Sequence, residues 1–411
     1  MTTDAIRLNP LDPDVYRAGS PANHGYPHEL YRVLRNEHPC LKVQLNLPGF
    51  VDSTWILSRH ADVVVVDRDS TLFSSTSGHT HRKVELTSTE TEGKPSMITM
   101  DGSDHLRLRK MVSKTFTPRV IRAFEREYRS MAEDVVAEAV SKGTFDLVEE
   151  IAVELPAYAI CNLLGVPAEH RRQVVDWTNT LVSQDEEYST GGKTLEKAME
   201  GLADYALELA DIRRRDPGDD VVSGLVEKIG GPELSQDEYV GMVFLLAAAG
   251  NETTRTNIGH SVHALLNSPE ELEFLRGASE TEWDTAVEEL TRFATPIIGF
   301  RRIATADVEF QGQVIPRGDS VTMLFAAANF DESVFENAEE LNLRRAPNPH
   351  VSFGAGGRHF CLGAHLARLE TKVVLQELFR QVGSLQIVSQ PDYARDSTIR
   401  GIKHLEVSVT P

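Results

Sequence analysis

Cysteine is scarce in this sequence. Only three of the 411 residues are cysteine, Cys40, Cys161 and Cys361, an odd number at wide separations. Such a pattern excludes a disulfide framework and a zinc site built from paired cysteines. Because unpaired cysteines are typical of a reducing compartment, we expect a cytoplasmic protein.

Long apolar runs are also missing. The most apolar stretch, Tyr239 to Gly250, extends for twelve residues without a charge, whereas a bilayer-spanning helix needs about 20 residues. The N-terminal segment has neither the basic part nor the apolar part of a secretory signal. The sequence therefore predicts no membrane anchor and no secretory signal.

Positive charge is in short supply, since 42 Lys and Arg residues stand against 62 Asp and Glu residues and give a formal net charge of −20. An acidic protein repels polyanions over most of its surface, so we expect no nucleic acid partner. With 41% apolar and 25% charged residues, the composition is that of an ordinary globular protein. No repeat or long linker interrupts the chain, and we predict one domain over residues 1–411.

The hydrophobic pattern predicts a mainly α fold with a minor β portion. Short strands are expected between Leu41 and Leu57, and helices follow one another from Pro118 to Asn267. The longest helix begins where Ser235 and Glu238 form a capping-box pattern, and it runs for more than thirty residues.

Later segments return to strand-like patterns, namely residues 302–310, 313–315 and 321–324. Between Ser74 and Pro95 the sequence is polar and lacks a helical period. Long loops in compact proteins are usually functional covers or disordered, so this loop is a candidate lid.

One cysteine lies in an unusual setting. Residues 353–369 form a glycine-rich loop that delivers Cys361 to the start of an amphipathic helix, where the positive end of the helix dipole favours a thiolate. Four glycines surround the cysteine and leave room for a flat, bulky partner, namely Gly354, Gly356, Gly357 and Gly363. A single soft ligand suggests haem iron, and a buried structural thiol is the alternative.

The segment Gly357-Arg-His359-Phe-Cys361-Leu-Gly363, followed by Ala-His-Leu-Ala-Arg, resembles the haem-binding loop of the cytochrome P450 monooxygenases. The resemblance implies a single triangular α-rich domain with small sheets, and it makes Cys361 the axial ligand of the iron of haem b. Phe353 lies eight residues before the cysteine, one residue farther than in many bacterial members.

The long helix contains Ala249-Gly250-Asn251-Glu252-Thr253-Thr254, which resembles the oxygen-activation motif of the same family. A mid-helix threonine can donate to a preceding carbonyl, and Gly250 would leave room for dioxygen beside Ala249. The resemblance implies that Thr253 holds a proton-donating water and that Glu252 relays protons from solvent. By itself the motif is also compatible with a solvated face of a long helix.

A carboxylate and two guanidinium groups resemble the family's structural network. Glu289 and Arg292 are three residues apart on one helical face, and Arg345 would complete a buried cluster that holds the cysteine loop. We assign these residues to folding and haem retention.

Haem propionates need basic or hydrogen-bonding partners. The resemblance implies that the propionates are bound by His105 and Arg109, which share one helical face, and by Arg302 and His359. Each of these side chains could instead be an ordinary surface residue.

A hydrophobic substrate pocket is expected along the long helix and two later turns. Its predicted lining comprises Met242, Leu245 or Leu246, Ile297, Ile298, Phe300 and Ile402. The motifs look most like those of actinobacterial members that hydroxylate methyl-branched lipids, terpenoids or sterol side chains.

The sequence thus predicts a monooxygenase that inserts one oxygen atom of O2 into a C–H bond, with electrons from NAD(P)H through a reductase and a ferredoxin. Six basic residues and no acid lie between Leu106 and Arg122, and an acidic electron carrier could dock there. Two alternatives remain: a peroxide-using hydroxylase, and a non-catalytic haem protein that senses gas or carries a ligand.

Overall fold

The structure is a computed structural model that describes residues 9–12, 15–16, 25–46, 49–81, 95–182 and 195–410. Two compact units share the chain, and each is assembled from three separate stretches. The first unit comprises residues 1–84, 260–361 and 393–402, and the second comprises residues 85–259, 362–392 and 403–411.

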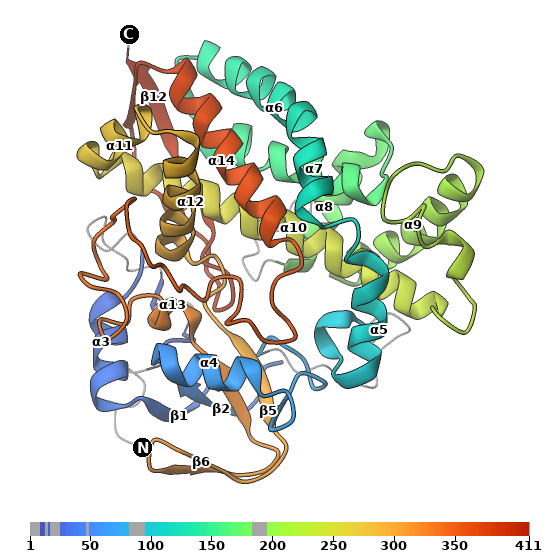
Figure 1. The fold of residues 1–411 in the computed structure, drawn as a ribbon, viewed down its shortest axis with the longest axis vertical. Helices are drawn as coiled ribbons and strands as arrows, with labels where there is room; N and C mark the ends of the chain where they lie inside the picture. Colours follow the sequence, from blue (N-terminus) through green and yellow to red (C-terminus); the bar gives the residue numbers. More distant parts are fainter. Residues whose placement is uncertain are drawn as a thin grey trace. The chain divides into compact units, whose positions relative to one another are not determined.

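A mixed five-stranded sheet organises the first unit (Figure 1). Its strand order is β1 (Cys40–Gln44), β2 (Ser53–Leu57), β8 (Ser320–Met323), β5 (Phe300–Ala304) and β3 (Phe73–Ser74). All neighbours are antiparallel except β2 and β8, which are parallel. Helix α4 (His60–Arg68) packs against β8. The strands supply a fully buried apolar layer that includes Ile56, Val321 and Met323.

The rest of the first unit surrounds this sheet with short helices and a hairpin. The helices are α3 (His28–Glu37), α11 (Pro269–Arg276), α12 (Glu280–Ala294) and α13 (Phe325–Ala328). Ser279 caps α12 through a reciprocal capping box with Glu282. Strands β6 (Val308–Phe310) and β7 (Gln313–Ile315) are joined by Gln311 and Gly312, both at positive φ, as a tight hairpin turn requires.

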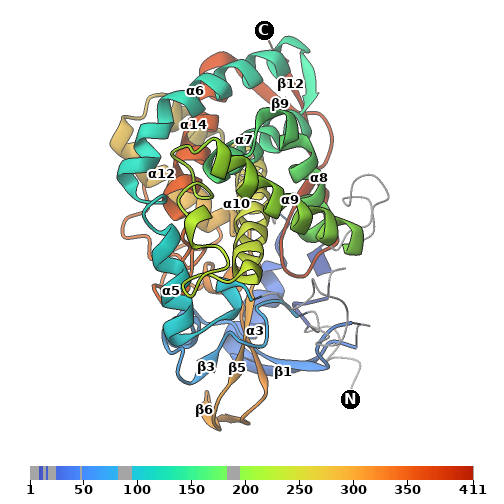
Figure 2. The same cartoon turned by 90° about the vertical axis from the view of Figure 1, so that its right-hand side faces the viewer.

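Helices dominate the second unit, and α6 (Pro118–Ser141) lies alongside α14 (Ala364–Gln381) in both views (Figures 1 and 2). This unit also contains α5 (Gly102–Val112), α7 (Glu154–Leu164), α8 (Arg171–Val182) and α9 (Leu195–Arg215). Shorter helical turns are η2 (Met97–Thr99), η3 (Val148–Ala152), η4 (Ala168–His170) and η6 (Val226–Lys228). A three-stranded sheet has the order β4 (Thr144–Asp146), β12 (Glu406–Thr410) and β9 (Ser384–Ile387).

The longest helix is α10 (Gln236–Leu266), with 31 residues. Residues up to Gly259 belong to the second unit, and those from His260 belong to the first. The predicted capping box is present, because the Ser235 backbone N–H donates to Glu238 at 2.9 Å and the Glu238 N–H donates to the Ser235 hydroxyl at 3.2 Å. Two short strands, β10 (Asp392–Tyr393) and β11 (Ile402–His404), complete the elements.

The predicted mainly α fold with a minor β portion is confirmed, as are the early strands, the long helix and the later strand segments. The strand expected over 302–310 is interrupted, because residues 305–307 turn between β5 and β6. Of the candidate lid at 74–95, residues 82–94 lie outside the described residues. The expectation of one domain stays a prediction.

Candidate active site

The cysteine loop ends at an accessible thiol. Cys361 is exposed, whereas Cys40 and Cys161 are buried, and burial raises the pKa of each of these two thiols to about 12. The backbone N–H of Cys361 donates to the carbonyl of Phe353 at 2.9 Å. Helix α14 begins at Ala364, three residues after the cysteine, with Gly363 as its N-cap. The alternative of a buried structural thiol is therefore wrong for Cys361.

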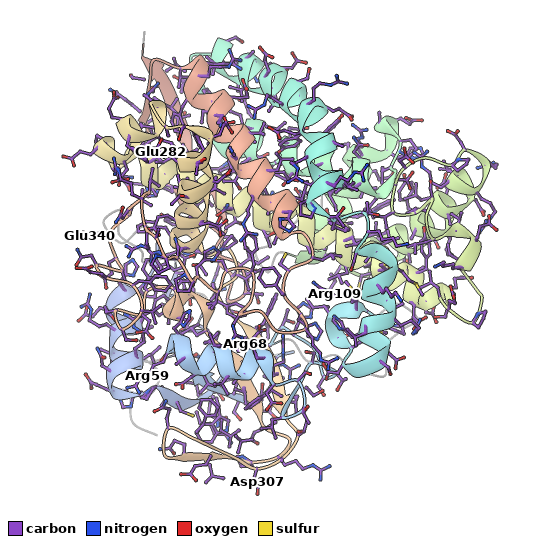
Figure 3. All side chains as sticks on the ribbon, in the orientation of Figure 1. Arg59, Arg68, Arg109, Glu282, Asp307 and Glu340 are labelled. Carbon is purple, nitrogen blue, oxygen red and sulfur yellow. The ribbon has the colours of Figure 1, made fainter. Side chains whose placement is uncertain are left out.

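The C-terminal end of α4 holds this loop, a contact that the sequence analysis missed. The Asp67 carboxylate accepts hydrogen bonds from the N–H groups of Ala355 at 2.8 Å and Gly357 at 3.0 Å. Arg68 donates from Nε to the carbonyl of Ala355 at 2.7 Å. Figure 3 shows Arg68 at this end of α4 and Arg59 at the other. The loop is thus fixed by an acid and a base almost 290 residues earlier in the chain.

Three glycines of the loop are required by the backbone of the turn and by its contact with α4. Gly354 and Gly356 have φ values of +87° and +84°, a region that L side chains rarely adopt. A Cβ at Gly357 would lie 2.0 Å from the backbone oxygen of Asp67. These glycines therefore serve the turn and its contact with α4, and the expectation that they also leave room for a bulky partner stays a prediction.

Basic side chains gather in the first unit. Arg302 is buried, and its guanidinium lies 3.9 Å from the Asp67 carboxylate. His359 contacts the Ser75 hydroxyl at 3.2 Å through Nε2. Desolvation lowers the pKa of His79 to about 4, and the nearby charges of Arg302, Arg301 and His359 lower it further. The structure therefore brings two predicted propionate partners together, and it adds His79, which no sequence motif marked.

The predicted structural network is present and buried. The Glu289 carboxylate accepts from Arg292 Nε at 2.7 Å and Nη2 at 2.8 Å, and from Arg345 Nε at 3.0 Å. Glu289 also accepts from the Asn342 N–H and the Asn348 amide, each at 3.0 Å. Glu289 and Arg292 are fully buried, so this carboxylate balances two cations in a medium of low dielectric.

A polar chain connects this network to the cysteine loop. Arg292 donates to the Asn329 carbonyl at 2.7 Å, and the Asn329 amide donates to the Ser352 hydroxyl at 2.8 Å. Ser352, which directly precedes Phe353, donates in turn to the carbonyl of Thr291 at 2.9 Å. Hydrogen bonds through Asn329 and Ser352 thus link the network to the loop that it is predicted to hold.

In the second unit, the two residues of α10 that are predicted to handle protons, Glu252 and Thr253, lie in different surroundings. Thr253 is partly exposed, and its hydroxyl donates to the Ala249 carbonyl at 2.7 Å. Glu252 is buried and is bonded to Arg255 one helical turn later. The sequence analysis missed Arg255, although its spacing of three residues from Glu252 is a pairing signal.

Gly250 has a packing role that the sequence analysis did not predict. A Cβ at this position would lie 2.9 Å from Cγ1 of Ile160 on α7. The space on the side of Gly250 where a Cβ would lie is therefore filled by an isoleucine side chain, and the expectation that the glycine leaves room for dioxygen stays a prediction. Its absent side chain allows α7 and α10 to approach closely.

The predicted pocket residues divide by burial. Met242, Leu246, Ile298 and Ile402 are buried, and Ile298 packs in the core cluster of the first unit with Tyr26 and Phe330. Partial or full exposure is found instead at Leu245, Ala249, Ile297 and Phe300. Because Leu245, Ala249 and Thr253 are spaced by four residues, they share one face of α10. This face favours Leu245 over Leu246 as a pocket residue.

Helix α5 carries the other two predicted propionate partners. His105 is buried and Arg109 is partly exposed, and Figure 3 shows Arg109 on this helix. In the same basic run, Arg107 is bonded to Glu238. The basic residues of the run that remain exposed are Lys110, Lys114, Arg119 and Arg122.

A buried acid on α14 also escaped the sequence analysis. Glu370 is 1% exposed, and neither of its carboxyl oxygens has a hydrogen-bond partner among the described residues. Burial raises the pKa of Glu370 well above its usual value, and the neighbouring Thr254 hydroxyl lowers it by less. The Tyr128 hydroxyl lies close enough for Glu370 to raise its pKa as well.

These residues fit a haem with an axial thiolate. Within the described ranges, no group of three or more His, Cys, Asp or Glu side chains could hold a metal ion, so a metal at Cys361 must bring its other ligands. The thiol is exposed, and basic groups of the first unit lie close enough to His79 to lower its pKa. An anionic group bound there would relieve this repulsion, as propionates do.

Comparison with known proteins identifies the class. The cytochrome P450 family profile matches residues 283–384, which hold Glu289, Arg292 and the cysteine loop. Together with relatives that are 37% identical over 93% of the chain, this match shows that the protein belongs to the cytochrome P450 family. It is therefore an oxidoreductase, a cytochrome P450 monooxygenase, with the fold of that family.

Named relatives narrow the comparison. A steroid C26-monooxygenase of Mycolicibacterium smegmatis is 37% identical, with 93% of this chain and 91% of the relative covered. A methyl-branched lipid omega-hydroxylase of Mycobacterium tuberculosis is 36% identical, with 92% and 90% covered. A Mycobacterium marinum cytochrome P450 solved with pseudoionone has a TM-score of 0.87 and 36% identity, with 96% and 98% covered. In the described part of this chain, no helix has the length and apolarity to span a membrane.

Proposed function

We propose that this monooxygenase hydroxylates a C–H bond of a hydrophobic small molecule of the steroid, methyl-branched lipid or terpenoid class. The observation that carries this proposal is the 37% identity to a steroid C26-monooxygenase over 93% of the chain. The partly exposed apolar side chains of Leu245, Ile297 and Phe300 suit a substrate that is oriented by few polar contacts.

Haem b is the cofactor that we assign to this chain. The Cys361 thiolate would hold the haem iron, and Phe353, Gly363, Ala249 and Gly250 would contact the haem. Arg302, His359, His105 and Arg109 hold the propionates. When bound, the haem supplies the activation of O2 with two electrons and the insertion of one oxygen atom into the substrate.

Two side chains of α10 handle the protons that this reaction consumes. Thr253 holds a water molecule through its hydroxyl oxygen, which remains an acceptor while its proton is donated to the Ala249 carbonyl. Glu252 passes protons toward that water from its carboxylate, after the carboxylate has parted from Arg255.

Electrons come from NAD(P)H through a ferredoxin reductase and a ferredoxin. The exposed lysines and arginines between Lys110 and Arg122 support an acidic carrier, because a local positive surface on an otherwise acidic protein steers a negative partner. The paired Arg107 adds less to that surface than its neighbours do.

A peroxide-using hydroxylase is the second enzymatic candidate. The presence of Glu252 and Thr253 argues against it, because proton delivery to dioxygen is unnecessary when peroxide is the oxidant. A non-catalytic haem protein would show neither a spectral response to hydrophobic ligands nor ligand-dependent consumption of NAD(P)H.

A spectral binding screen tests the proposal. Purified holoprotein is titrated with steroids, methyl-branched fatty acids and pseudoionone, and products are identified after incubation with NADPH and a surrogate ferredoxin and reductase. We expect a spin-state change and a hydroxylated product from one of these classes. A reduced carbon-monoxide spectrum that is unaltered by Cys361→Ala would contradict the assignment of the axial ligand.

A further inference from the structure

A buried arginine of the first unit lies among four tyrosines. Arg400 is 0% exposed, and its guanidinium carbon lies 3.9 Å from the ring centre of Tyr393 and 5.4 Å from that of Tyr16. Tyr26 and Tyr31 are also fully buried, and the Arg400 charge is close enough to oppose the rise of their pKa on burial. We call these five residues the arginine–tyrosine cluster, and none of them has a role in the proposed function.

The positive charge of Arg400 has no carboxylate partner among the residues that the structure describes. Burial lowers the pKa of its guanidinium to about 10, so the group is still cationic at neutral pH. The nearest acid along the chain is Asp396, whose Oδ1 accepts from the N–H groups of Thr398 at 2.6 Å and Ile399 at 3.1 Å. That carboxylate oxygen is therefore used by the turn itself.

The tyrosines do not supply a negative charge either. Burial raises the pKa of all four above the usual value, so their hydroxyls are neutral at neutral pH. Tyr16 donates to the Pro10 carbonyl at 2.6 Å, and Tyr31 donates to the Tyr16 hydroxyl at 3.0 Å. Tyr26 donates to the Thr295 carbonyl at 2.7 Å. A buried cation with neutral neighbours is strongly unfavourable unless a negative charge joins it.

Hydrogen bonding is incomplete at the same place. Nε of Arg400 donates to the Gly25 carbonyl at 2.6 Å, whereas Nη1 and Nη2 have no acceptor within the described ranges. In the same part of the chain, the buried hydroxyl of Tyr393 has no partner. A Cβ at Gly25 would lie 2.7 Å from Arg400 Nη2 and 2.8 Å from Tyr393 Cζ, so the two groups are neighbours. Charged N–H donors beside an O–H donor are the groups that bind an anion.

The enclosure of these donors favours a small ion with a single charge. Tyr393 is buried, and the other members of the cluster are fully buried, so an ion has to lose its water on entry. Because the cost of removing water rises with charge, phosphate and sulfate are disfavoured relative to a halide. The positive edges of the tyrosine rings are also suited to an anion without directional lone pairs.

The backbone of Arg400 connects the cluster to the predicted pocket. Its N–H donates to the Pro296 carbonyl at 3.1 Å, and its carbonyl contacts Nε2 of His260 at 2.7 Å. The residues that follow Pro296 and precede Arg400, Ile297 and Ile399, form an antiparallel bridge. Since Ile297 is one of the partly exposed apolar residues assigned to the substrate, the position of Arg400 bears on the pocket.

We propose that the arginine–tyrosine cluster binds a chloride ion, held by the Nη1 and Nη2 groups of Arg400 and by the hydroxyl of Tyr393. The ion balances the buried charge and fixes the Arg400 side chain, and with it the segment that carries Ile297. The effect on the pocket rests on the proposed function, whereas the ion site does not.

An exchange of salts at constant ionic strength tests the ion site. The holoprotein is unfolded by urea in sodium gluconate, whose anion is too large for the enclosed cluster, and gluconate is replaced stepwise by chloride. An ion that binds only the folded state raises the folding equilibrium constant in proportion to its concentration above the dissociation constant. We therefore expect an increase of about tenfold for each tenfold increase in chloride in that range, and bromide should act in the same way.

Variants assign this effect to the cluster. Arg400→Met should abolish the dependence on chloride. The matched control is Arg35→Met, because Arg35 is a buried arginine of the same unit that is paired with Glu332 at 2.8 Å. This control should lose stability and keep the dependence on chloride. Should Arg400→Met not fold, Tyr393→Phe removes one donor and should raise the dissociation constant of chloride about tenfold.

Three results would overturn the ion site: equal stability in chloride and gluconate, an undiminished chloride effect in Arg400→Met or Tyr393→Phe, and water beside Arg400 where anomalous scattering from crystals in bromide should locate the ion. For the pocket, the dissociation constant of pseudoionone, measured by the spin-state change, should be several-fold lower in chloride than in gluconate. Equal values in the two salts exclude the effect on the pocket. The absence of any spectral response in both salts contradicts the proposed function instead, and the urea titration then decides on the ion site by itself.

Discussion

Replacing Glu289 by glutamine is the sharpest test of how the cysteine loop is held. The change removes one negative charge that serves two buried guanidinium groups, those of Arg292 and Arg345. Five donors reach the two carboxylate oxygens, and a glutamine amide offers an acceptor oxygen on one side only. At least two donors then face an N–H group.

The expected loss follows from burial. Glu289 and Arg292 are 0% exposed, and Arg345 is 9% exposed, so water cannot replace the missing acceptor. Breaking a buried ion pair by removing one partner costs about 3–5 kcal/mol. We therefore expect Glu289→Gln to lower the free energy of unfolding by about that amount, measured by urea denaturation of the holoprotein, and to increase the rate of haem loss to apomyoglobin.

The neighbouring Glu288 provides the control. It pairs with His350 at 2.9 Å, but its side chain is 29% exposed. A pair that water reaches contributes about 0–1 kcal/mol, so Glu288→Gln should have a small effect. Similar losses of below about 1 kcal/mol in both variants would refute the reasoning, because the Glu289 network would then be no stronger than a surface pair.

Thr253→Ala should retain haem and ligand binding but lower product formation on the order of 10²-fold and divert O2 to hydrogen peroxide, which is measured as peroxide released per NADPH consumed. An unchanged yield of product per NADPH would show that Thr253 takes no part in proton delivery. The pKa of Glu370 is raised in the folded protein, so the folded protein keeps this proton at pH values where the unfolded chain has lost it. Between the usual glutamate pKa and the raised one, the folding equilibrium constant should therefore fall about tenfold per pH unit relative to that of Glu370→Gln. Parallel urea-denaturation curves for the two proteins across this range would show that Glu370 ionises normally. Gly250→Ala should cost about 1–3 kcal/mol by overpacking, and Ile160→Val should recover part of that loss in the double variant, whereas additive losses would mean that the two residues do not contact.

Much of the fold follows from local signals. The capping box at Ser235 and Glu238 places the start of α10 to within a residue, because the two side chains satisfy backbone donors that are only three residues apart in the sequence. The pair Glu289 and Arg292 is likewise three residues apart on one helix. Such contacts depend on spacing that can be counted along the chain.

Contacts between distant segments could not be predicted in this way. Asp67 binds the cysteine loop across almost 290 residues, and no spacing rule connects the two. Ile160 fills the space beside Gly250 because two helices pack together, and a glycine in a helix gives no sign of its neighbour. His79 and Glu370 are marked by desolvation, which depends on what surrounds a residue in the folded state.

The hold of α4 on the cysteine loop has a consequence for protein engineering. Chimeric monooxygenases are often assembled by exchanging contiguous blocks. If the cysteine loop came from a relative with other residues at the end of α4, its N–H groups would find no carboxylate, and a side chain at position 357 would collide with the Asp67 carbonyl. Residues 67 and 68 therefore have to be transplanted together with residues 354–357 as one recombination module, although almost 290 residues separate the two segments in the sequence.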